Sequence, residues 1–428
     1  MSRNIVIIGN GIAGITAARM IRKGSAEAVI RVISGESDHF YSRTALMYIY
    51  MGHLSYENTK PYEDRFWQEN RIELIRGWAT GVDPERKRVL MSDGEHVGYD
   101  TLVIASGSVP RPFGCPGEDL RGVTGLYGLR DLAAVEEYSR GIDHAVVVGG
   151  GLIGVELAEM LRSRHIGVTM LVRESEYWSN ILPDDEGRLV GRHIRAHGVD
   201  LRTSTELREI KGDDAGRVRS VVTMSGEEIS CQFVGMTIGV QPNVEWLRGV
   251  EGLELERGVM VDDYFRTTLP DVYAVGDCVQ FRDACPGHPP IEQLWYTGRI
   301  HGETVARTIL GRETEYDRGV WFNSAKFFDI EYQTYGLVPP AFGDQDGCFY
   351  WESADGCRAL RVVYRKSDRI VIGAHTFGIR HRHDVWESWL RAGRDVDDVM
   401  RDLRLVNFDP EFSRRHEREI LRAYEAAS

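Results

Sequence analysis

Two glycine-rich turns, at residues 9–14 and 149–154, contain the residues of this chain whose types and spacing indicate chemistry. Each follows an apolar run, Ile5–Ile8 or Val146–Val148, and each opens a helix-like stretch. Glycines at this spacing let the backbone approach a pyrophosphate, and the N-terminus of the following helix supplies partial positive charge. One such fingerprint is weak evidence, but two predict two dinucleotide sites on one chain. Two dinucleotides suggest an electron relay, in which one brings hydride and the other receives it.

The turns and the first residues of their helices are the expected phosphate-binding positions. They are Gly9, Gly11, Ile12, Ala13 and Gly14 in the first turn, and Gly149, Gly151, Leu152, Ile153 and Gly154 in the second. Glu36 lies just past the expected strand Val29–Ile33, at the usual distance for an acid that accepts hydrogen bonds from a ribose diol. A surface glutamate in a turn is the alternative.

The cysteines indicate neither a redox disulfide motif nor a zinc site. The chain has six cysteines but no CxxC or CxxxxC pattern. Cys278 and Cys285 with His288 match no zinc spacing. We therefore expect free thiols and no metal.

Length and composition predict several domains. A chain of 428 residues is too long for one ordinary core, and 42% hydrophobic with 27% charged residues is typical of globular proteins. No run approaches eighteen apolar residues, so no integral membrane span is expected. The start runs directly into the first strand without room for a signal peptide, which favours the cytoplasm. The net charge of −13 argues against nucleic-acid binding.

The order of the elements predicts an inserted domain. The first unit has the helix Ile12–Arg22 and the strand Thr101–Ala105, and the second repeats the pattern with the helix Leu152–Ser163 and the strand Val168–Val172. The strand at 272–277 has no glycine turn of its own and is expected to return to the first sheet. The predicted fold class is α/β, with two Rossmann-like domains, the second inserted in the first. The predicted segments are 1–112, 113–245, 246–318 and 319–428.

A smaller α+β domain is expected from about Val320. Short alternating strands come first, and helices follow near Asp384–Ala392 and Asp395–Leu403. The run Val109–Gly117 reads as a linker. Asp409 and Pro410 are expected to start a last charged helix that ends at Ala427.

Four ordered motifs carry a family resemblance. The two glycine turns, the strand end Ala105-Ser106-Gly107 and the stretch ending in Gly276-Asp277 resemble the two-dinucleotide-domain flavoprotein reductases of the pyridine nucleotide–disulfide reductase superfamily. The resemblance implies that the first turn holds FAD, that Asp277 holds its ribityl–phosphate part, and that the second turn holds NAD(P)H.

The segment after Glu36 resembles one branch of that superfamily. Disulfide reductases carry CxxxxC there, and the single-cysteine enzymes carry a cysteine near Ser42 or Arg43, but the first cysteine here is Cys115. Glu36 followed by Tyr41-Ser42-Arg43 instead resembles the ferredoxin and rubredoxin reductases, which implies that Arg43 lies beside the FAD phosphates. Tyr48 stands where that branch has a lysine near the flavin. A phenol there carries no positive charge to favour reduced anionic flavin, and packing is its alternative role.

The resemblance also implies roles for other residues. Glu156 matches the acid near the nicotinamide. Val172 stands where NADH enzymes have an acid, and Arg173 could pair with a 2′-phosphate, which gives a weak lean to NADPH that Glu174 and Glu176 oppose. Trp295 and Tyr296 precede the helix Thr297–Leu310, whose N-terminus is implied to face the flavin. We also expect Ala79, Ala105, Ser106, Gly107 and Gly276 to bind cofactor.

These observations predict an FAD enzyme that takes hydride from NAD(P)H and passes electrons to a small ferredoxin- or rubredoxin-type protein. Two alternatives stay open. One is a reductase of a small molecule or quinone, or the flavin subunit of a larger redox complex. The other is a signalling flavoprotein that resembles the apoptosis-inducing flavoproteins. The sequence leaves the oligomeric state open.

Overall fold

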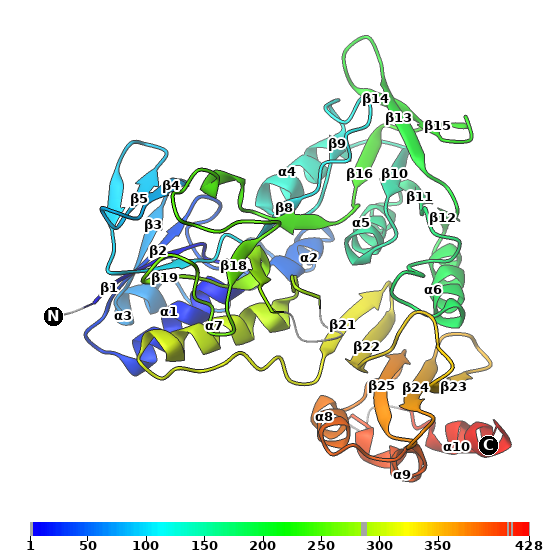
Figure 1. Ribbon diagram of the computed structural model, residues 1–428. Helices are drawn as coiled ribbons and strands as arrows, with labels where there is room; N and C mark the ends of the chain where they lie inside the picture. The colour runs from blue at the N-terminus through cyan, green and yellow to red at the C-terminus, as the bar shows by residue number, and fades with distance from the viewer. Residues whose placement is uncertain (1–2, 284–288, 409–410, 412–413, 428) are drawn as a thin grey trace. The chain divides into compact units, whose positions relative to one another are not determined.

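The computed structural model describes residues 3–283, 289–408, 411 and 414–427 (Figure 1). It divides into two compact units, each described by itself below. Unit 1 is Met1–Pro112, Tyr127–Ala133 and Gly239–Arg318, and unit 2 is Phe113–Leu126, Ala134–Ile238 and Gly319–Ser428.

A five-stranded parallel sheet forms the centre of unit 1. Its strands are, in spatial order, β19 (Val272–Ala274), β7 (Thr101–Ile104), β1 (Asn4–Ile8), β2 (Val29–Ser34) and β3 (Ile72–Arg76). The buried apolar residues of these strands form the core of the unit. Because β19 comes from the far end of the chain, the prediction that this strand returns to the first sheet is confirmed.

Two helices pack side by side against each other in unit 1, α1 (Ile12–Gly24) and α7 (Trp295–Ile309) (Figure 1). Gly302 makes the close approach possible, because a Cβ there would lie 2.5 Å from the carbonyl oxygen of Ala13. The shorter helices of the unit are η1 (Arg43–Ala45), α2 (Leu46–Tyr50), η2 (Tyr56–Thr59), α3 (Arg65–Glu69), η3 (Glu245–Leu247) and η4 (Gly276–Cys278). A small antiparallel sheet consists of β4 (Ala79–Asp83), β5 (Arg88–Met91) and β6 (His96–Gly98). Two further pairs of strands are β8 (Ser108–Pro110) with β17 (Val240–Pro242) and β18 (Val259–Val261) with β20 (Val279–Phe281).

Unit 2 contains a second five-stranded parallel sheet. Its strands, in spatial order, are β12 (Val199–Arg202), β11 (Gly167–Leu171), β10 (His144–Val148), β16 (Phe233–Met236) and β9 (Val123–Thr124). The helix α4 (Leu129–Tyr138) begins in unit 1 and continues into unit 2 at Ala134. The other helices of this stretch are α5 (Leu152–Ser163) and α6 (Asp184–Ala196), and a small antiparallel sheet joins β13 (Leu207–Gly212), β14 (Val218–Thr223) and β15 (Glu228–Ser230).

An antiparallel sheet with helices follows in unit 2. The strands, in spatial order, are β21 (Phe322–Phe327), β22 (Ile330–Gly336), β25 (Val371–Phe377), β24 (Ala359–Arg365) and β23 (Asp346–Glu352), and the helices are α8 (His383–Arg391), α9 (Val396–Arg401), η5 (Leu403–Val406) and α10 (Glu417–Ala427). Trp386 and Trp389, three residues apart in α8, lie in its core. The predicted fold class is confirmed, whereas the four segment boundaries stay a prediction.

Several boundaries differ from the prediction. The last helix begins at Glu417, because the described residues 414–416 are not helical; Asp409 and Pro410 lie outside the described residues. Trp295 and Tyr296 belong to α7 instead of preceding it. Val109 and Pro110 pair in β8 and are not part of a linker. Among the described helices, none is long and apolar enough to cross a membrane.

Candidate functional site

The first glycine turn needs Gly9 and Gly14 for steric reasons, whereas Gly11 borders open space. Gly9 has φ +112°, and a Cβ there would lie 2.1 Å from the carbonyl oxygen of Ala105. A Cβ on Gly14 would lie 2.1 Å from the carbonyl oxygen of Gly9, so that glycine lets the helix pack on the turn. A Cβ on Gly11 would meet nothing within 4 Å. Open space thus lies at the N-terminus of α1, which begins at Ile12 and has no side-chain cap and no acid in its first turn. This arrangement suits a phosphate.

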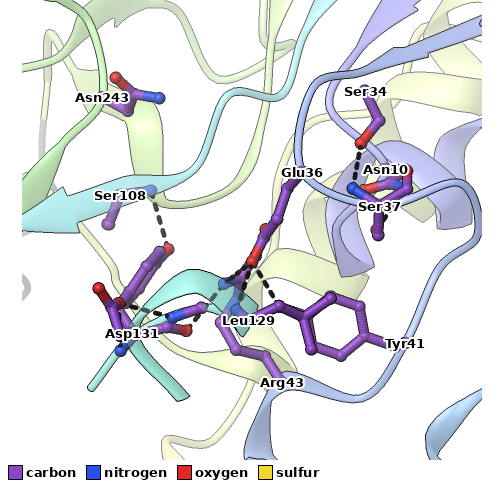
Figure 2. Close-up of polar contacts among 12 residues, drawn as sticks. Asn10, Ser34, Glu36, Ser37, Tyr41, Arg43, Ser108, Leu129, Asp131 and Asn243 are labelled. Carbon is purple, nitrogen blue, oxygen red and sulfur yellow. Dashed lines mark hydrogen bonds and ion pairs between the residues drawn. The ribbon is translucent and has the colours of Figure 1, made fainter. Parts of the chain in front are cut away.

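Asn10 ties this turn to the segment after β2. Its side-chain amide donates to the carbonyl oxygen of Ser37 at 3.0 Å and lies 3.1 Å from the Ser37 hydroxyl (Figure 2). Ser37 is the neighbour of Glu36. The acid expected to bind a ribose is therefore held next to the glycine turn by a buried hydrogen-bond pair.

Glu36 is the centre of a polar network in unit 1 (Figure 2). The Nη2 of Arg43 donates to its Oε2 at 2.6 Å, while the Tyr41 hydroxyl and the Leu129 backbone amide donate to its Oε1 at 2.6 and 3.0 Å. Burial by itself would raise the pKa of Glu36, but the Arg43 guanidinium and the other two donors lower it below the usual value. Glu36 is therefore an ionised carboxylate whose Oε2 keeps room for a further donor.

Arg43 contacts Glu36 and Tyr127 in unit 1. Its guanidinium forms an ion pair with Glu36 and donates from Nη1 to the carbonyl oxygen of Tyr127 at 2.8 Å. It also lies over the Tyr127 ring, 4.5 Å from the centroid. The sequence analysis did not predict the Glu36–Arg43 ion pair. The only signal for it was two opposite charges seven residues apart in a segment after a strand. The placement of Arg43 beside phosphates stays a prediction.

Asp277 lies in η4, directly after β19, in a second polar network of unit 1. The Ser108 hydroxyl donates to its Oδ2 at 3.0 Å, and the Gln293 side-chain amide donates to the Ser108 hydroxyl at 2.7 Å. Burial raises the pKa of Asp277 above its ordinary value, against the lowering effects of Ser108 and Arg43. Within the described residues, Oδ1 accepts no hydrogen bond. One carboxylate oxygen is thus held by the protein and the other is left for a hydroxyl donor.

The glycine before this aspartate brings the network to the first turn. Gly276 has φ +80°, and a Cβ there would lie 2.9 Å from the Cβ of Ala13 in α1. Its amide donates to Nδ1 of the buried His301 at 3.1 Å. The first glycine turn and Asp277, both predicted to bind the same cofactor, are therefore neighbours in unit 1.

The strand end after β7 is held by Asn243. The Ser106 hydroxyl donates to the carbonyl oxygen of Asn243 at 2.8 Å, and the backbone N–H of Asn243 donates to the carbonyl oxygen of Gly107 at 2.9 Å. Gly107 has φ +69°, which favours glycine. Ala105 is the residue that Gly9 approaches, so these positions border the first turn.

The remaining predicted residues of unit 1 lie on other elements. Ala79 begins β4 opposite Met91. Tyr48 lies in α2, and its ring stacks on His53 with centroids 6.2 Å apart. Trp295 and Tyr296 open α7 with their rings edge to face at 5.4 Å. The roles of these residues toward a cofactor stay predictions.

The second glycine turn repeats the geometry of the first in unit 2. Gly149 has φ +116°, and a Cβ there would lie 2.5 Å from the carbonyl oxygen of Thr237. A Cβ on Gly154 would lie 2.2 Å from the carbonyl oxygen of Gly149, whereas a Cβ on Gly151 would meet nothing within 4 Å. The helix α5 begins at Leu152 and Ile153, again without a side-chain cap. Both turns therefore fit the pyrophosphate of a dinucleotide.

Glu156 is the acid one turn into α5. Burial raises its pKa to about 7, and the neighbouring Glu159 carboxylate adds to the shift, while Lys326 opposes it. The Lys326 ammonium is 2.6 Å from Oε1 of Glu159. Glu156 therefore changes its charge near neutral pH, which suits a residue that handles a proton or adjusts to a bound nicotinamide.

Arg173 follows β11, and its side chain is 71% exposed. The guanidinium pairs with Oε1 of the adjacent Glu174 at 3.0 Å. Val172 before it is buried. An exposed guanidinium at this strand end can reach a phosphate, but an acid already competes for it.

The chain is similar to several known proteins. The family model described as "Pyridine nucleotide-disulphide oxidoreductase" matches residues 3–302. A ferredoxin–NAD(P)(+) reductase from Sphingomonas sp is 30% identical over 372 residues, which cover 86% of this chain and 88% of that protein. A rubredoxin–NAD(+) reductase from Pseudomonas putida is 30% identical over 312 residues, which cover 72% and 80%. The solved structure of an NAD-dependent persulfide reductase from A. fulgidus superimposes with a TM-score of 0.86 at 26% identity, covering 99% of this chain and 83% of that one.

Proposed function

Because the chain belongs to the pyridine nucleotide-disulphide oxidoreductase family, for which FAD and NAD(P)H are expected, we propose that it passes electrons from NAD(P)H through FAD to a ferredoxin- or rubredoxin-type protein. Bound FAD would accept hydride and release electrons singly, which links a two-electron nicotinamide to a one-electron carrier. The two glycine turns of equal geometry, one in each unit, are the observation that carries the proposal.

The residues of unit 1 would hold the FAD. The amides at the start of α1 would bind its pyrophosphate, and Glu36 would accept hydrogen bonds from a ribose through the free side of Oε2. Asp277 would accept a hydroxyl of the ribityl–phosphate part at Oδ1, while Ser108 keeps its other oxygen in place. The N-terminus of α7 would stabilise negative charge on the flavin ring.

The protein acceptor is supported by the cysteine pattern and the relatives. No cysteine occurs among the first 114 residues, so that segment cannot supply a redox thiol. Two of the relatives are named for reducing ferredoxin or rubredoxin. Steady-state oxidation of NADH and NADPH with a panel of ferredoxins, rubredoxins, quinones and ferricyanide tests the acceptor. We expect turnover with at least one iron–sulfur or rubredoxin-type carrier. Turnover with quinones or other small molecules alone would contradict it.

We also propose a weak preference for NADPH, with Arg173 pairing the 2′-phosphate. Val172 places no acid against a phosphate, whereas the Glu174 carboxylate has to be displaced from Arg173 first. R173A should raise KM for NADPH several-fold more than KM for NADH, because a charge-assisted hydrogen bond is lost. R208A is a matched control, because Arg208 is also exposed and also pairs with the next residue, Glu209, at 2.8 Å. Equal changes of both KM values in R173A would remove this role.

A further inference from the structure

A cluster of two histidines and an aspartate lies in unit 2. His193 is in the last turn of α6, and His197 is the residue that caps it. The four-residue spacing puts both rings on one face, with centroids 4.4 Å apart. Asp329 comes from the tight turn between β21 and β22. Their ligand atoms all lie within 4.8 Å of one another.

We propose that His193, His197 and Asp329 form a binding site for a late first-row divalent ion, with Zn²⁺ as the expected occupant. Imidazole nitrogens and a carboxylate oxygen are the ligands that Zn²⁺ takes, and three protein ligands leave a fourth position for water. Oδ1 of Asp329 lies 2.5 Å from Nε2 of His193 and 3.3 Å from Nε2 of His197. Both histidines thus point the same nitrogen at the same carboxylate.

The orientation of His197 favours metal binding. Its Nδ1 is 2.9 Å from the carbonyl oxygen of His193. A carbonyl oxygen can only accept, so Nδ1 carries the proton and Nε2 of the neutral ring offers a lone pair. Metal-bound histidines are typically held by such a hydrogen bond from the other nitrogen. The ring of Phe328 stacks on His197 with centroids 4.5 Å apart and fixes the ring plane.

The carboxylate can adjust to an ion. Ligand bonds of about 2.0–2.1 Å in a tetrahedral site put the ligand atoms about 3.4 Å apart. Oδ1 of Asp329 would therefore have to move about 1 Å farther from Nε2 of His193. Its present distance of 3.3 Å from Nε2 of His197 is already close to the separation that a tetrahedral site needs. The Asp329 side chain is 75% exposed, whereas that of His193 is only 9% exposed. We therefore expect Asp329 to make this movement.

The charges around the cluster do not exclude a cation. The same open pocket is lined by Glu159, Lys326 and Glu331. Lys326 is the nearby cation, and its charge is compensated by Glu159 at 2.6 Å. Glu331 pairs with Arg380. A bound ion would link α6 to the β21–β22 turn within unit 2, so we expect it to stabilise this unit instead of taking part in electron transfer.

Zinc binding by the flavin-loaded protein tests the site. Equilibrium dialysis against Zn²⁺ with elemental analysis gives the stoichiometry, and calorimetric titration gives the affinity. We expect D329N to weaken one Zn²⁺ site by at least about tenfold, since the loss of even an outer-shell partner costs roughly 10–100-fold. The variant H193A/H197A should lose that one equivalent, and H96A, which removes an exposed histidine of β6, should keep it.

Thermal unfolding keeps the test decisive if the double variant does not fold. Asn is isosteric with Asp, and Asp329 is exposed, so D329N should fold as the wild type does. Zn²⁺ at a concentration near the Kd of the wild type should raise Tm of the wild type and of H96A by more than it raises Tm of D329N. Equal zinc content and equal Tm shifts in the wild type and D329N would overturn the proposal, as would a wild type that binds no zinc. The cluster would then be a hydrogen-bonded ion pair.

Discussion

Glu156 is the residue whose protonation connects stability with pH. Its folded pKa of about 7 lies above the ordinary value of 4.5, because burial and Glu159 disfavour its charge. Between these two pH values the folded chain binds more protons at this site than the unfolded chain does. The stability contributed by the protonated form is therefore present below pH 4.5 and is lost as the pH rises through about 7.

The substitution E156Q removes this titration. We expect E156Q to gain unfolding stability over the wild type as the pH rises from 4.5 to 8, by at most about 3 kcal/mol, since each pKa unit corresponds to about 1.4 kcal/mol. Thermal unfolding across this range measures the gain, with E206Q as an exposed control in unit 2. A Tm difference between E156Q and the wild type that does not change with pH would contradict the assigned shift.

Asp277 is the residue on which flavin retention should depend most. D277A removes the carboxylate that Ser108 holds in place, so we expect the purified variant to be colourless, with FAD affinity lowered at least about tenfold for a lost charge-assisted hydrogen bond. The ratio of absorbance at the visible flavin band to that at 280 nm measures FAD content. D38A is the control, because the side chain of Asp38 is 75% exposed. A yellow D277A with full flavin content would count against this role.

At the scale of elements, substitutions in the two glycine turns can separate an effect on cofactor binding from an effect on folding. Gly11 and Gly151 have negative φ values of −72° and −85°, and a methyl group at either position would point into open space. Alanine at these positions is compatible with the fold but occupies the space at the helix N-terminus. G11A should therefore lose FAD and G151A should keep FAD but raise KM for NAD(P)H, with little change in Tm.

Gly9 provides the contrasting result. Alanine there would combine φ +112° with a contact of 2.1 Å to the carbonyl oxygen of Ala105, and backbone strain of this kind costs about 1–3 kcal/mol. G9A should thus lower Tm as well as FAD content. If G11A lowered Tm as much as G9A, or if G151A lost FAD, the separate roles of the glycines would be wrong.

Elements with a strong local signal could be predicted, and those that depend on partners could not. The helix α5 has the predicted bounds Leu152–Ser163, because a glycine turn starts it and Arg164 caps its end. The strand β23 (Asp346–Glu352) was not predicted, since it begins at a turn with Gly347 and owes its pairing to β24. His381 stands between two arginines in the sequence, yet it is buried and accepts a hydrogen bond from the Trp386 indole.

At the scale of the whole molecule, the sequence predicted the return of a late strand to the first sheet but not the networks between distant segments. The apolar strand Val272–Ala274 without a glycine turn was enough to predict an inserted domain. The contacts of Glu36 with Leu129 and of Asp277 with Ser108 join residues 93 and 169 positions apart. Such side-chain pairs depend on how loops meet after folding, which single-sequence patterns do not encode.

The central claim is an electron relay between two dinucleotides, NAD(P)H and FAD, without a redox disulfide. Anaerobic titration of the flavin-loaded protein with NADPH or NADH, followed at the visible flavin band, tests it most directly. We expect complete bleaching with one equivalent of nucleotide per flavin, because only two electrons can be stored. A protein without flavin absorbance after reconstitution, or one that takes up four electrons per flavin, would contradict the account.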